Sequence, residues 1–483
     1  MKMKTFKQGL HLLEKKELSE EKKIKRISFP SRVILPLSQH TGAPCEALVK
    51  KGDVVKEGEK IADSSSFVSS PIHASISGKV SSIEKMPHPL GGEVTSIIIE
   101  READDERRVW DKVAVPFMAQ LSNESDRYKN EREDADESTE ENKVKSEVDI
   151  SSLEPTEIRS KIREAGIVGL GGAAFPTHVK LSPPEDKPIE AVILNGCECE
   201  PYLTSDHRLM LERADDCIYG LKVIMKALGA KSGYVGIENS KPGAVALFRE
   251  KLKEEDNIEV VSLKTKYPQG GEKMLIKAIL NREVPSLVSN GTTSRAGLPL
   301  DVGVVVNNVG TAVAIAEAIK WDKPLLERVV TVTGGAVKNS SNLLVPLGTS
   351  FSHLIDECGG LKKKASKVIM GGPMMGISQY SLEVPVIKGT SGILVLTRKE
   401  TLFKEEGPCI KCSQCIDYCP MGLLPTTLAR LAKKERWDSL KDYNIMDCIE
   451  CGCCTYVCPS KIPLVHYIKL GKLQVQKGTT SRA

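Results

Sequence analysis

The chain has 483 residues, which is long enough for about three or four domains with separate cores. Its net charge of only +4, without a basic stripe of interleaved aromatic residues, argues against nucleic acid as a partner. No apolar run approaches the roughly 20 residues of a membrane span, and the lysine-rich N-terminus lacks the apolar core of a signal peptide. The composition therefore predicts a protein that is soluble or peripheral to a membrane.

The first part of the chain combines an N-terminal extension, 1–28, with a β-rich region, 29–105. Short strands such as 95–99 alternate there with Gly and Pro turns. The pattern is similar to the barrel-sandwich domains that carry biotin or lipoate. Those domains modify a lysine 11 residues before a late glycine, and this count from Gly78 reaches Phe67. We therefore expect a docking or structural domain without a swinging arm.

Residues 106–150 are highly charged. Between Ser122 and Asp149 there are 11 acidic and 5 basic residues, with almost nothing apolar to bury. Such a composition predicts a solvated, flexible linker.

Residues 151–322 alternate apolar strands, such as 191–194 and 302–306, with helical stretches, which is typical of α/β layering. A glycine-rich loop between Gly166 and Thr177 lies near the start of this region. Residues with little or no side chain let backbone N–H groups approach a phosphate. Taken alone, the loop is equally compatible with a plain tight turn.

Two further regions complete the chain. Residues 323–398 return to short strands and fit a small mixed domain, and residues 399–470 combine cysteines with helical stretches before a tail, 471–483. Nine of the 14 cysteines lie between Cys409 and Cys458. Such clustering in a large chain points to metal binding in a reducing compartment and not to disulfides.

The clustered cysteines form the run C-x2-C-x2-C-x3-C-P twice. Three close thiolates can bind one face of a [4Fe–4S] cluster, and in two-cluster ferredoxins the fourth cysteine binds the other cluster. A pair of four-cysteine zinc sites is the alternative, although these usually use two separated C-x2-C pairs. Similarity to two-cluster ferredoxins implies two ligand sets: Cys409, Cys412, Cys415 and Cys458, then Cys419, Cys448, Cys451 and Cys454. Cys453 lies outside the pattern, and we expect it to be a small packed residue.

Four motifs of the α/β region resemble the NADH-binding flavoprotein subunit of respiratory complex I. They are the loop, N-G-C-E-C-E-P at 195–201, Y-P-Q-G-G-E-K at 267–273 and N-N-V-G-T at 307–311. The resemblance implies FMN over the loop and NAD(H) stacked on the exposed flavin face. The implied cofactor-binding residues are Gly169, Gly171, Gly172, Ala173, Phe175, Lys180, Asn195, Glu198, Glu200, Gly270, Glu272, Asn307, Asn308 and Thr311.

The resemblance also implies individual roles. Lys180 would stand near the FMN phosphate, and Asn195, Glu198 and Asn308 would bond the ring or ribityl groups. Phe175 and Glu200 would contact NAD(H). No catalytic side chain is expected, because the flavin N5 receives the hydride directly. Acidic residues of the family are replaced here by Cys197, Gly271 and Gly310.

A closer resemblance, to the C subunits of Rnf electron-transport complexes, covers nearly the whole chain. It rests on F-K-Q-G-L-H at 6–11, H-T-G-A-P at 40–44, P-I-H-A at 71–74 and G-G-P-M-M-G at 371–376. It implies a multidomain α/β protein. Its parts would be a β barrel-sandwich N-terminal domain, an α/β flavin-nucleotide domain, a β-grasp (SLBB-like) domain and a C-terminal helical two-cluster ferredoxin domain.

This resemblance implies an NAD(H)-dependent oxidoreductase subunit with FMN and two [4Fe–4S] clusters. It would lie at the cytoplasmic face of the membrane as a peripheral protein, exchange electrons with the other Rnf subunits and indirectly with ferredoxin, and leave ion transport to those subunits. Two alternatives stay open. One is a cobalamin reductase of similar build, and the other is an electron-relay scaffold without a working flavin site, suggested by the three replaced acidic residues.

Overall fold

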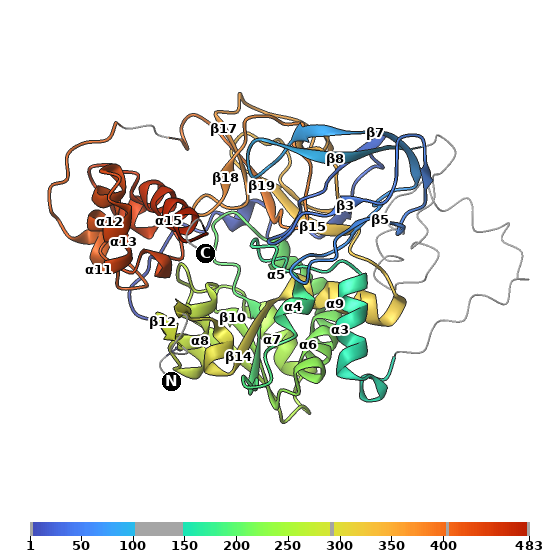
Figure 1. Cartoon of the computed structure of the whole chain (residues 1–483), viewed down its shortest axis with the longest axis horizontal. Coiled ribbons are helices and arrows are strands. Elements are labelled where there is room, and N and C mark those ends of the chain that lie inside the picture. The colour runs from blue at the N-terminus through green and yellow to red at the C-terminus, as the bar shows by residue number, and fades with distance from the viewer. Residues whose placement is uncertain (1–2, 102–147, 290–293, 402–404, 481–483) are drawn as a thin grey trace, which may run out of the picture.

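The computed structural model describes residues 3–101, 148–289, 294–401 and 405–480. Most of the stretch expected to be a linker, 106–150, lies outside these ranges. Figure 1 shows an α/β body (green and yellow) below a β-rich body (blue and orange), with a smaller helical body (red) beside them.

The β-rich N-terminal region consists of two small antiparallel sheets that share one apolar core. Val33, Ile61, Ile97 and Ile99 in this core have no exposed surface. The sheets have the orders β2-β8-β7-β4 and β3-β5-β6. The strands are β2 (Arg32–Pro36), β3 (Glu46–Ala47), β4 (Val54–Val55), β5 (Lys60–Asp63), β6 (Ile72–His73), β7 (Gly78–Pro87) and β8 (Glu93–Glu100). The predicted barrel-sandwich architecture is confirmed.

The α/β region is built on a parallel sheet with the order β11-β10-β9-β14. Its strands are β9 (Ala191–Gly196), β10 (Ser232–Glu238), β11 (Ile258–Leu263) and β14 (Val304–Asn308), and a separate hairpin is formed by β12 (Leu287–Ser289) and β13 (Ser294–Ala296). The three consecutive strands β9, β10 and β11 proceed in one direction, whereas β14 lies on the other side of β9. The strand order therefore reverses between β9 and β14.

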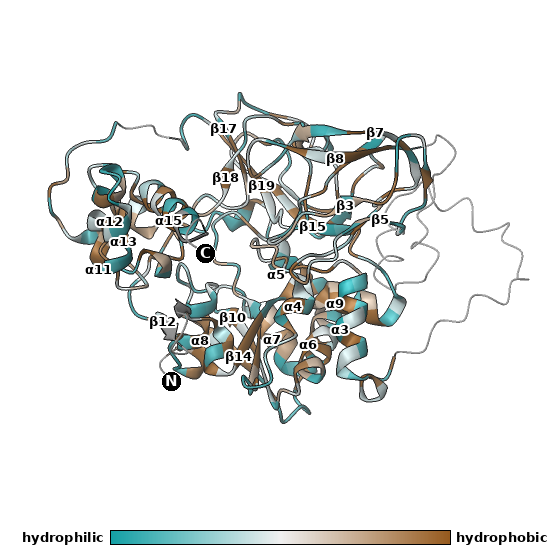
Figure 2. Ribbon diagram, viewed as in Figure 1, coloured by the Kyte–Doolittle hydropathy of each residue, from teal (hydrophilic) through white to brown (hydrophobic). Residues whose placement is uncertain are grey.

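Helices cover both faces of this sheet, as the continuous apolar strands require. Val192 and Leu194 pack with α6 and α9 on one face, whereas Ile193 packs with α8 on the other. β14 is hydrophobic along most of its length (Figure 2). The helices are α3 (Pro155–Glu164), α4 (Thr177–Lys180), α5 (Ser205–Glu212), α6 (Ala214–Leu228), α7 (Pro242–Lys251), α8 (Glu272–Leu280) and α9 (Val309–Trp321).

The β-grasp region is a six-stranded sheet with the order β1-β16-β15-β19-β17-β18. Its elements are β15 (Glu327–Thr333), β16 (Ser341–Pro346), α10 (Phe351–Glu357), β17 (Lys367–Met370), β18 (Ile377–Ser378) and β19 (Gly392–Leu396). The edge strand β1 (Ile24–Arg26) comes from the N-terminal extension, and Ile24 pairs with Asn342 of β16. The sequence predicted only an extension there, because a three-residue strand has no pattern of its own.

The C-terminal body is helical, as its cysteine spacer predicted. It contains α11 (Gln414–Asp417), α12 (Pro425–Lys433), α13 (Trp437–Asp442), α14 (Cys453–Val457) and α15 (Leu464–Thr480). Leu428, Leu440, Ile445 and Leu464 form a core of its own with several of the cysteines. The two cysteine runs therefore belong largely to a packed unit of their own.

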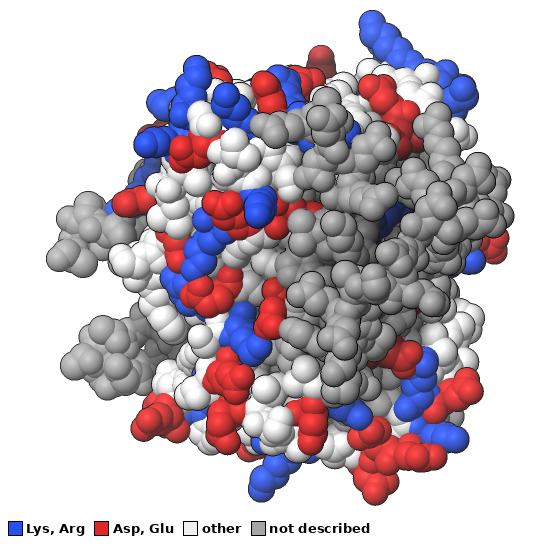
Figure 3. Space-filling model, turned by 90° about the vertical axis from the view of Figure 1, so that its right-hand side faces the viewer, with Lys and Arg blue, Asp and Glu red and all other residues white. Residues whose placement is uncertain are grey.

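The surface carries mixed charge. Figure 3 shows acidic and basic side chains interspersed among uncharged residues on the face that it draws, in keeping with the net charge of +4. In the described ranges, no helix has the length and apolar character needed to cross a membrane.

Candidate functional site

Two asparagines mark the point where the strand order reverses. Asn195 is the penultimate residue of β9 and the register partner of Asn308, which ends β14. In open parallel sheets, ligands bind in the crevice outside the carboxyl ends of the strands at such a switch point. Asn307, Asn308 and Asn195, all predicted from sequence, therefore lie where a cofactor is expected, and the Asn307 amide nitrogen is buried without a partner in the described residues.

The glycine-rich loop lies against this crevice. The Gly169 N–H donates to the Phe175 carbonyl at 2.8 Å, closing the loop, and the Leu170 N–H donates to Thr311 Oγ1 at 2.9 Å. A Cβ on Gly171 would lie 3.4 Å from the Cβ of Asn308, so the loop passes close to the end of β14. The structure thus brings the predicted residues of the loop together with Thr311 and Asn308.

The loop fits an anionic group such as the FMN phosphate. Within the described residues, the N–H groups from Gly171 to Phe175 donate to no acceptor. Gly171, Gly172 and Ala173 are exposed, and positive φ angles at Gly172 (110°) and Ala174 (48°) curve the backbone. Consecutive free N–H groups in such a concave turn form an anion-binding nest.

The third motif meets the same end of the sheet. Asn195 Nδ2 donates to the Gly270 carbonyl at 2.8 Å, and Glu272 forms an ion pair with Lys180. Three of the four motifs that resemble the complex I subunit therefore contribute residues around Asn195. Lys180 lies at the same site, where its ammonium group is paired with the Glu272 carboxylate.

Glu198 caps the N-terminus of helix α5 in the described residues. Its carboxylate accepts the N–H groups of Asp206 at 2.8 Å and His207 at 3.1 Å, at the N-terminus of α5, and lies 3.9 Å from Lys16 Nζ. Asp206 in turn accepts from Asn308 Nδ2 at 2.6 Å. Burial, helped by the negative charge of Glu198, raises the pKa of Asp206 to about 7. Neither Asp206 nor Lys16 was predicted as a site residue.

Glu200 binds a loop from the β-grasp region. Its carboxylate accepts the N–H groups of Met374 at 3.0 Å and Met375 at 2.8 Å. Burial raises its pKa to about 7, although these hydrogen bonds oppose the shift. Its role toward NAD(H) stays a prediction, and the structure adds that it fixes the G-G-P-M-M-G segment.

One predicted set of cluster ligands surrounds a single pocket. Cys419, Cys448, Cys451 and Cys454 line it together with apolar side chains such as Leu428 and Ile468. Cys419 comes from the first cysteine run and the other three from the second, as the crossed ligation requires. An apolar pocket whose lining includes these four cysteines has the donor set of a [4Fe–4S] cluster. Cys453 lines the same pocket and is fully buried.

The other ligand set lies nearer to the surface. Cys415 and Cys458 are buried, but Cys409 and Cys412 are exposed in a segment without regular structure. Helix α11, which contains Cys415, packs against α14, which precedes Cys458. We refer to the pocket of Cys419, Cys448, Cys451 and Cys454 as the inner cluster site and to this second set as the outer cluster site.

The inner cluster site adjoins the flavin region. Tyr267 Oη donates to the Cys451 carbonyl at 2.7 Å. Tyr267, Leu10, Cys451 and Cys453 form one small apolar cluster, with Cys199, Met374 and Ile449 packed against it. Because Gly270 also accepts from Asn195, the segment 267–270 contacts the switch point at one end and the inner cluster site at the other.

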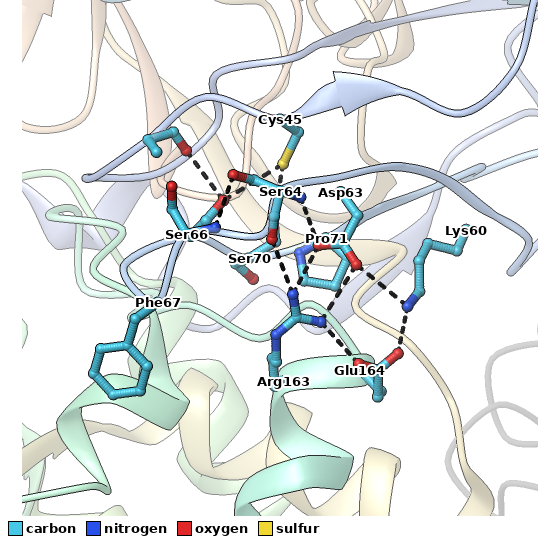
Figure 4. A network of polar contacts seen from close by, with 12 residues as sticks. Cys45, Lys60, Asp63, Ser64, Ser66, Phe67, Ser70, Pro71, Arg163 and Glu164 are labelled. Atoms are coloured by element: carbon cyan, nitrogen blue, oxygen red, sulfur yellow. Dashed lines mark hydrogen bonds and ion pairs between the residues drawn. The ribbon is translucent and has the colours of Figure 1, made fainter.

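The barrel-sandwich region docks on α3 (Figure 4). Arg163 Nη2 lies 3.0 Å from Asp63 Oδ1 and donates to the Ser64 carbonyl at 3.1 Å, and Lys60 pairs with Glu164. Phe67 stands where carrier domains have their modified lysine. Its ring packs edge-on against the His178 ring, with 5.8 Å between the ring centroids. The loop between β5 and β6 is thus held by the α/β region, in agreement with a docking or structural domain.

Four family models match successive parts of the chain. They are the RnfC barrel sandwich hybrid domain at residues 4–104, the Nuo51 FMN-binding domain at 162–317, the SLBB domain at 329–378 and the 4Fe-4S dicluster domain at 408–462. Their order is the order of domains that the resemblance implied.

Curated relatives match almost end to end. The chain is 44% identical over 475 residues to the C subunit of a proton-translocating ferredoxin:NAD(+) oxidoreductase complex of Clostridium ljungdahlii, covering 97% of this chain and 93% of the relative. It is 41% identical to the C subunit of the Na(+)-translocating complex of Acetobacterium woodii, covering 98% and 97%. It is 37% identical to the C subunit of the ion-translocating oxidoreductase complex of Rhodobacter capsulatus, covering 87% and 73%. The chain therefore belongs to the family of C subunits of ion-translocating ferredoxin:NAD(+) oxidoreductase complexes, the Rnf complexes.

Proposed function

We propose that this chain exchanges hydride with NAD(H) at a bound FMN and conducts single electrons through two [4Fe–4S] clusters. Membership of the Rnf C-subunit family and the matched FMN-binding and dicluster domains support this function. Its partners are the other subunits of a membrane Rnf complex, which carry the ion pathway and link it to ferredoxin. The proposal includes a peripheral position at the cytoplasmic face of the membrane.

The residues at the switch point would hold the flavin. The N–H groups of residues 171–175 would bind the phosphate, with Lys180 nearby as a point charge. Asn195 and Asn308 would bond the ring or ribityl groups, and Phe175 and Glu200 would meet NAD(H). When bound, FMN converts between the two-electron chemistry of hydride and the one-electron chemistry of iron–sulfur clusters. The chain itself would bind and orient the flavin and NAD(H) and exclude water from the site.

The observation that carries this proposal is the shared segment 267–270. It bonds Asn195 through the Gly270 carbonyl and the inner cluster site through Tyr267 Oη. The two kinds of redox site are therefore joined by one short piece of chain. We further propose that electrons pass between the flavin and the inner cluster site, and between the outer cluster site, with its exposed Cys409 and Cys412, and the partner subunits.

An anaerobic NADH titration of the chain reconstituted with FMN and iron–sulfur clusters tests this function. Flavin absorbance and the electron paramagnetic resonance (EPR) signal of reduced clusters are followed together. We expect flavin bleaching accompanied by a cluster signal. Clusters that dithionite reduces but NADH does not would contradict the proposal.

A second candidate function, an electron-relay scaffold, is favoured by one observation. Glu198 caps α5 and Glu200 binds the 374–375 backbone, so the carboxylates expected at the flavin and at NAD(H) already have internal partners. Under this alternative the purified chain with intact clusters would bind no FMN. Corrinoid reduction by the same preparation would instead favour the cobalamin reductase alternative.

A further inference from the structure

Two buried cations differ from the other buried cations of the molecule. Arg328 of β15 is 6% exposed and Lys388 is 1% exposed, yet in the described ranges neither forms an ion pair with a carboxylate. By contrast, buried Lys241, Lys323 and Arg213 are paired with Glu238, Glu317 and Glu317, respectively. Burying a charge without a counter-charge is costly. Asp206 acts on Arg328 and Asp63 acts on Lys388 only from beyond ion-pair distance, and burial outweighs both effects. The structure therefore retains two buried positive charges without a contacting carboxylate at one place.

That place is the underside of the glycine-rich loop. Arg328 Nη2 donates to the Leu170 carbonyl at 3.1 Å, and Nη1 donates to the Lys388 carbonyl. Lys388 Nζ donates to the Gly166 carbonyl at 2.7 Å and the Pro71 carbonyl at 2.6 Å. Both cations thus hold the loop by its carbonyl groups, and both come from the segment that follows the α/β region.

The barrel-sandwich region holds the other end of the same loop. Thr41 Oγ1 donates to the Ala173 carbonyl at 3.0 Å, and the Thr41 N–H donates to the Ala174 carbonyl at 3.1 Å. Two regions outside the α/β sheet therefore fix three parts of the loop, at Leu170, Ala173 and Ala174.

Fixing these carbonyls also fixes the direction of the N–H groups. In a planar trans peptide the C=O and N–H bonds point in opposite directions. Drawing the Leu170 carbonyl toward Arg328 turns the Gly171 N–H away from it, and Thr41 does the same for the N–H groups of Ala174 and Phe175. These are N–H groups without an acceptor in the described residues.

We propose that Arg328 and Thr41 are positioning residues for a phosphate monoester at residues 171–175, and that its charge balances buried Arg328 and Lys388. The proposal rests on the proposed function, since FMN is the phosphate monoester expected there. A phosphate monoester carries nearly two negative charges at pH 7, which would add to the distant charges of Asp206 and Asp63 in compensating the two cations. Burial lowers the pKa of Lys388 to about 7, although the more distant Cys45 and Asp63 oppose the shift.

Comparing FMN with riboflavin tests the role of Arg328, because riboflavin lacks only the phosphate. Both ligands are titrated by flavin fluorescence into the full chain with its clusters intact, as wild type, Arg328→Met and Arg328→Lys. We expect Arg328→Met to weaken FMN by about 10- to 100-fold, the range for losing a charged interaction. Riboflavin should weaken by less than about 3-fold, and Arg328→Lys should restore part of the FMN affinity. Equal weakening of both ligands would overturn the proposal.

Thr41→Val keeps the test decisive if Arg328→Met does not fold, because the Thr41 side chain is exposed. It removes the bond to the Ala173 carbonyl and should weaken FMN by about 3- to 10-fold, with little effect on riboflavin. Thr95→Val, at another exposed threonine of the same region, is the matched control and should change neither affinity. An unchanged FMN affinity in Thr41→Val would refute the positioning role. Failure of wild type to bind either flavin would instead refute the proposed function.

Discussion

The α/β region meets two of its neighbours, the barrel-sandwich region and the helical cluster module, through junctions of opposite chemistry. Its junction with the barrel-sandwich region is polar: Arg163 pairs with Asp63, Thr41 bonds the glycine-rich loop, and Lys388 donates to carbonyls from both sides. Its junction with the helical cluster module is mainly apolar, built on Tyr267, Leu10 and Cys451.

This difference follows from what each junction has to do. Directed hydrogen bonds fix the orientation of peptide groups, which a phosphate site needs. Apolar packing brings two redox sites together and keeps water out. It also lowers the dielectric response around an iron–sulfur cluster, which is one of the factors that set its potential. We infer that the first junction serves cofactor binding and the second serves electron transfer.

The largest expected effect comes from breaking the apolar junction at its cluster. Cys448→Ser removes a proposed ligand of the inner cluster site, and Cys412→Ser removes a proposed ligand of the outer cluster site. We expect NADH to reduce the remaining cluster in Cys412→Ser, whereas in Cys448→Ser only dithionite reduces the remaining cluster, since the link to the flavin is lost. EPR spectra of both variants, recorded at matched iron and FMN content after adding NADH or dithionite, measure the reduction of the remaining cluster. NADH reduction of the cluster in Cys448→Ser would reverse the assigned order.

Much of this organisation could be predicted from local sequence. The cysteine spacing pointed to two-cluster ferredoxins, and that resemblance implied the crossed ligand sets, four of whose members line one pocket. The motifs at 195–201 and 307–311 indicated the two strand ends of the switch point. These signals are local, because a short motif carries both the ligands and the turn that presents them.

The supporting residues could not be predicted in this way. Lys16 donates to the Glu198 and Leu203 carbonyls, and Ile24 pairs with β16, yet both come from the extension and meet partners far along the chain. Arg328 and Lys388 likewise act on a loop more than a hundred residues earlier. A lysine or arginine at such positions looks like any surface cation until the fold buries it.

A smaller effect is expected from breaking the polar junction at Arg163. Its pair with Asp63 is partly buried, with side-chain exposures of 29% and 21%. Arg163→Ala should lower the local opening free energy by about 1–2 kcal/mol, between the values for exposed and buried pairs. Amide hydrogen exchange at residues 62–68 should then be about 5- to 30-fold faster.

Lys161→Ala is the matched control on the same helix. Its partner Asp322 is 58% exposed, so solvent screens this pair more strongly. Exchange at residues 62–68 should stay within about 2-fold of wild type, in line with the small worth of an exposed pair. Equal acceleration in both variants would show that the junction does not depend on the Asp63 contact.

The smallest effect concerns the pH dependence of the same polar junction. Burial lowers the pKa of Lys388 from 10.5 to about 7, so between these values the opened junction holds more protons than the closed one. Stability therefore rises with pH across this window, and the penalty is complete below about pH 7. Burial keeps the neighbouring His40 and His73 neutral there, with pKa values of about 4 and about 3.

In FMN-free wild type, the opening free energy of the junction should increase by about 1 kcal/mol between about pH 7 and pH 8. Lys388→Met lacks the titrating group and should lose this increase. Amide hydrogen exchange at residues 72–74 and 166–167, corrected for intrinsic exchange rates, measures this opening free energy in wild type and in Lys388→Met. Burial raises the pKa of Cys45, and Asp63 stays ionised in this range, so neither group should produce the difference. Parallel pH profiles would mean that Lys388 already has a counter-charge, which would also remove the electrostatic reason for a phosphate at the loop above it.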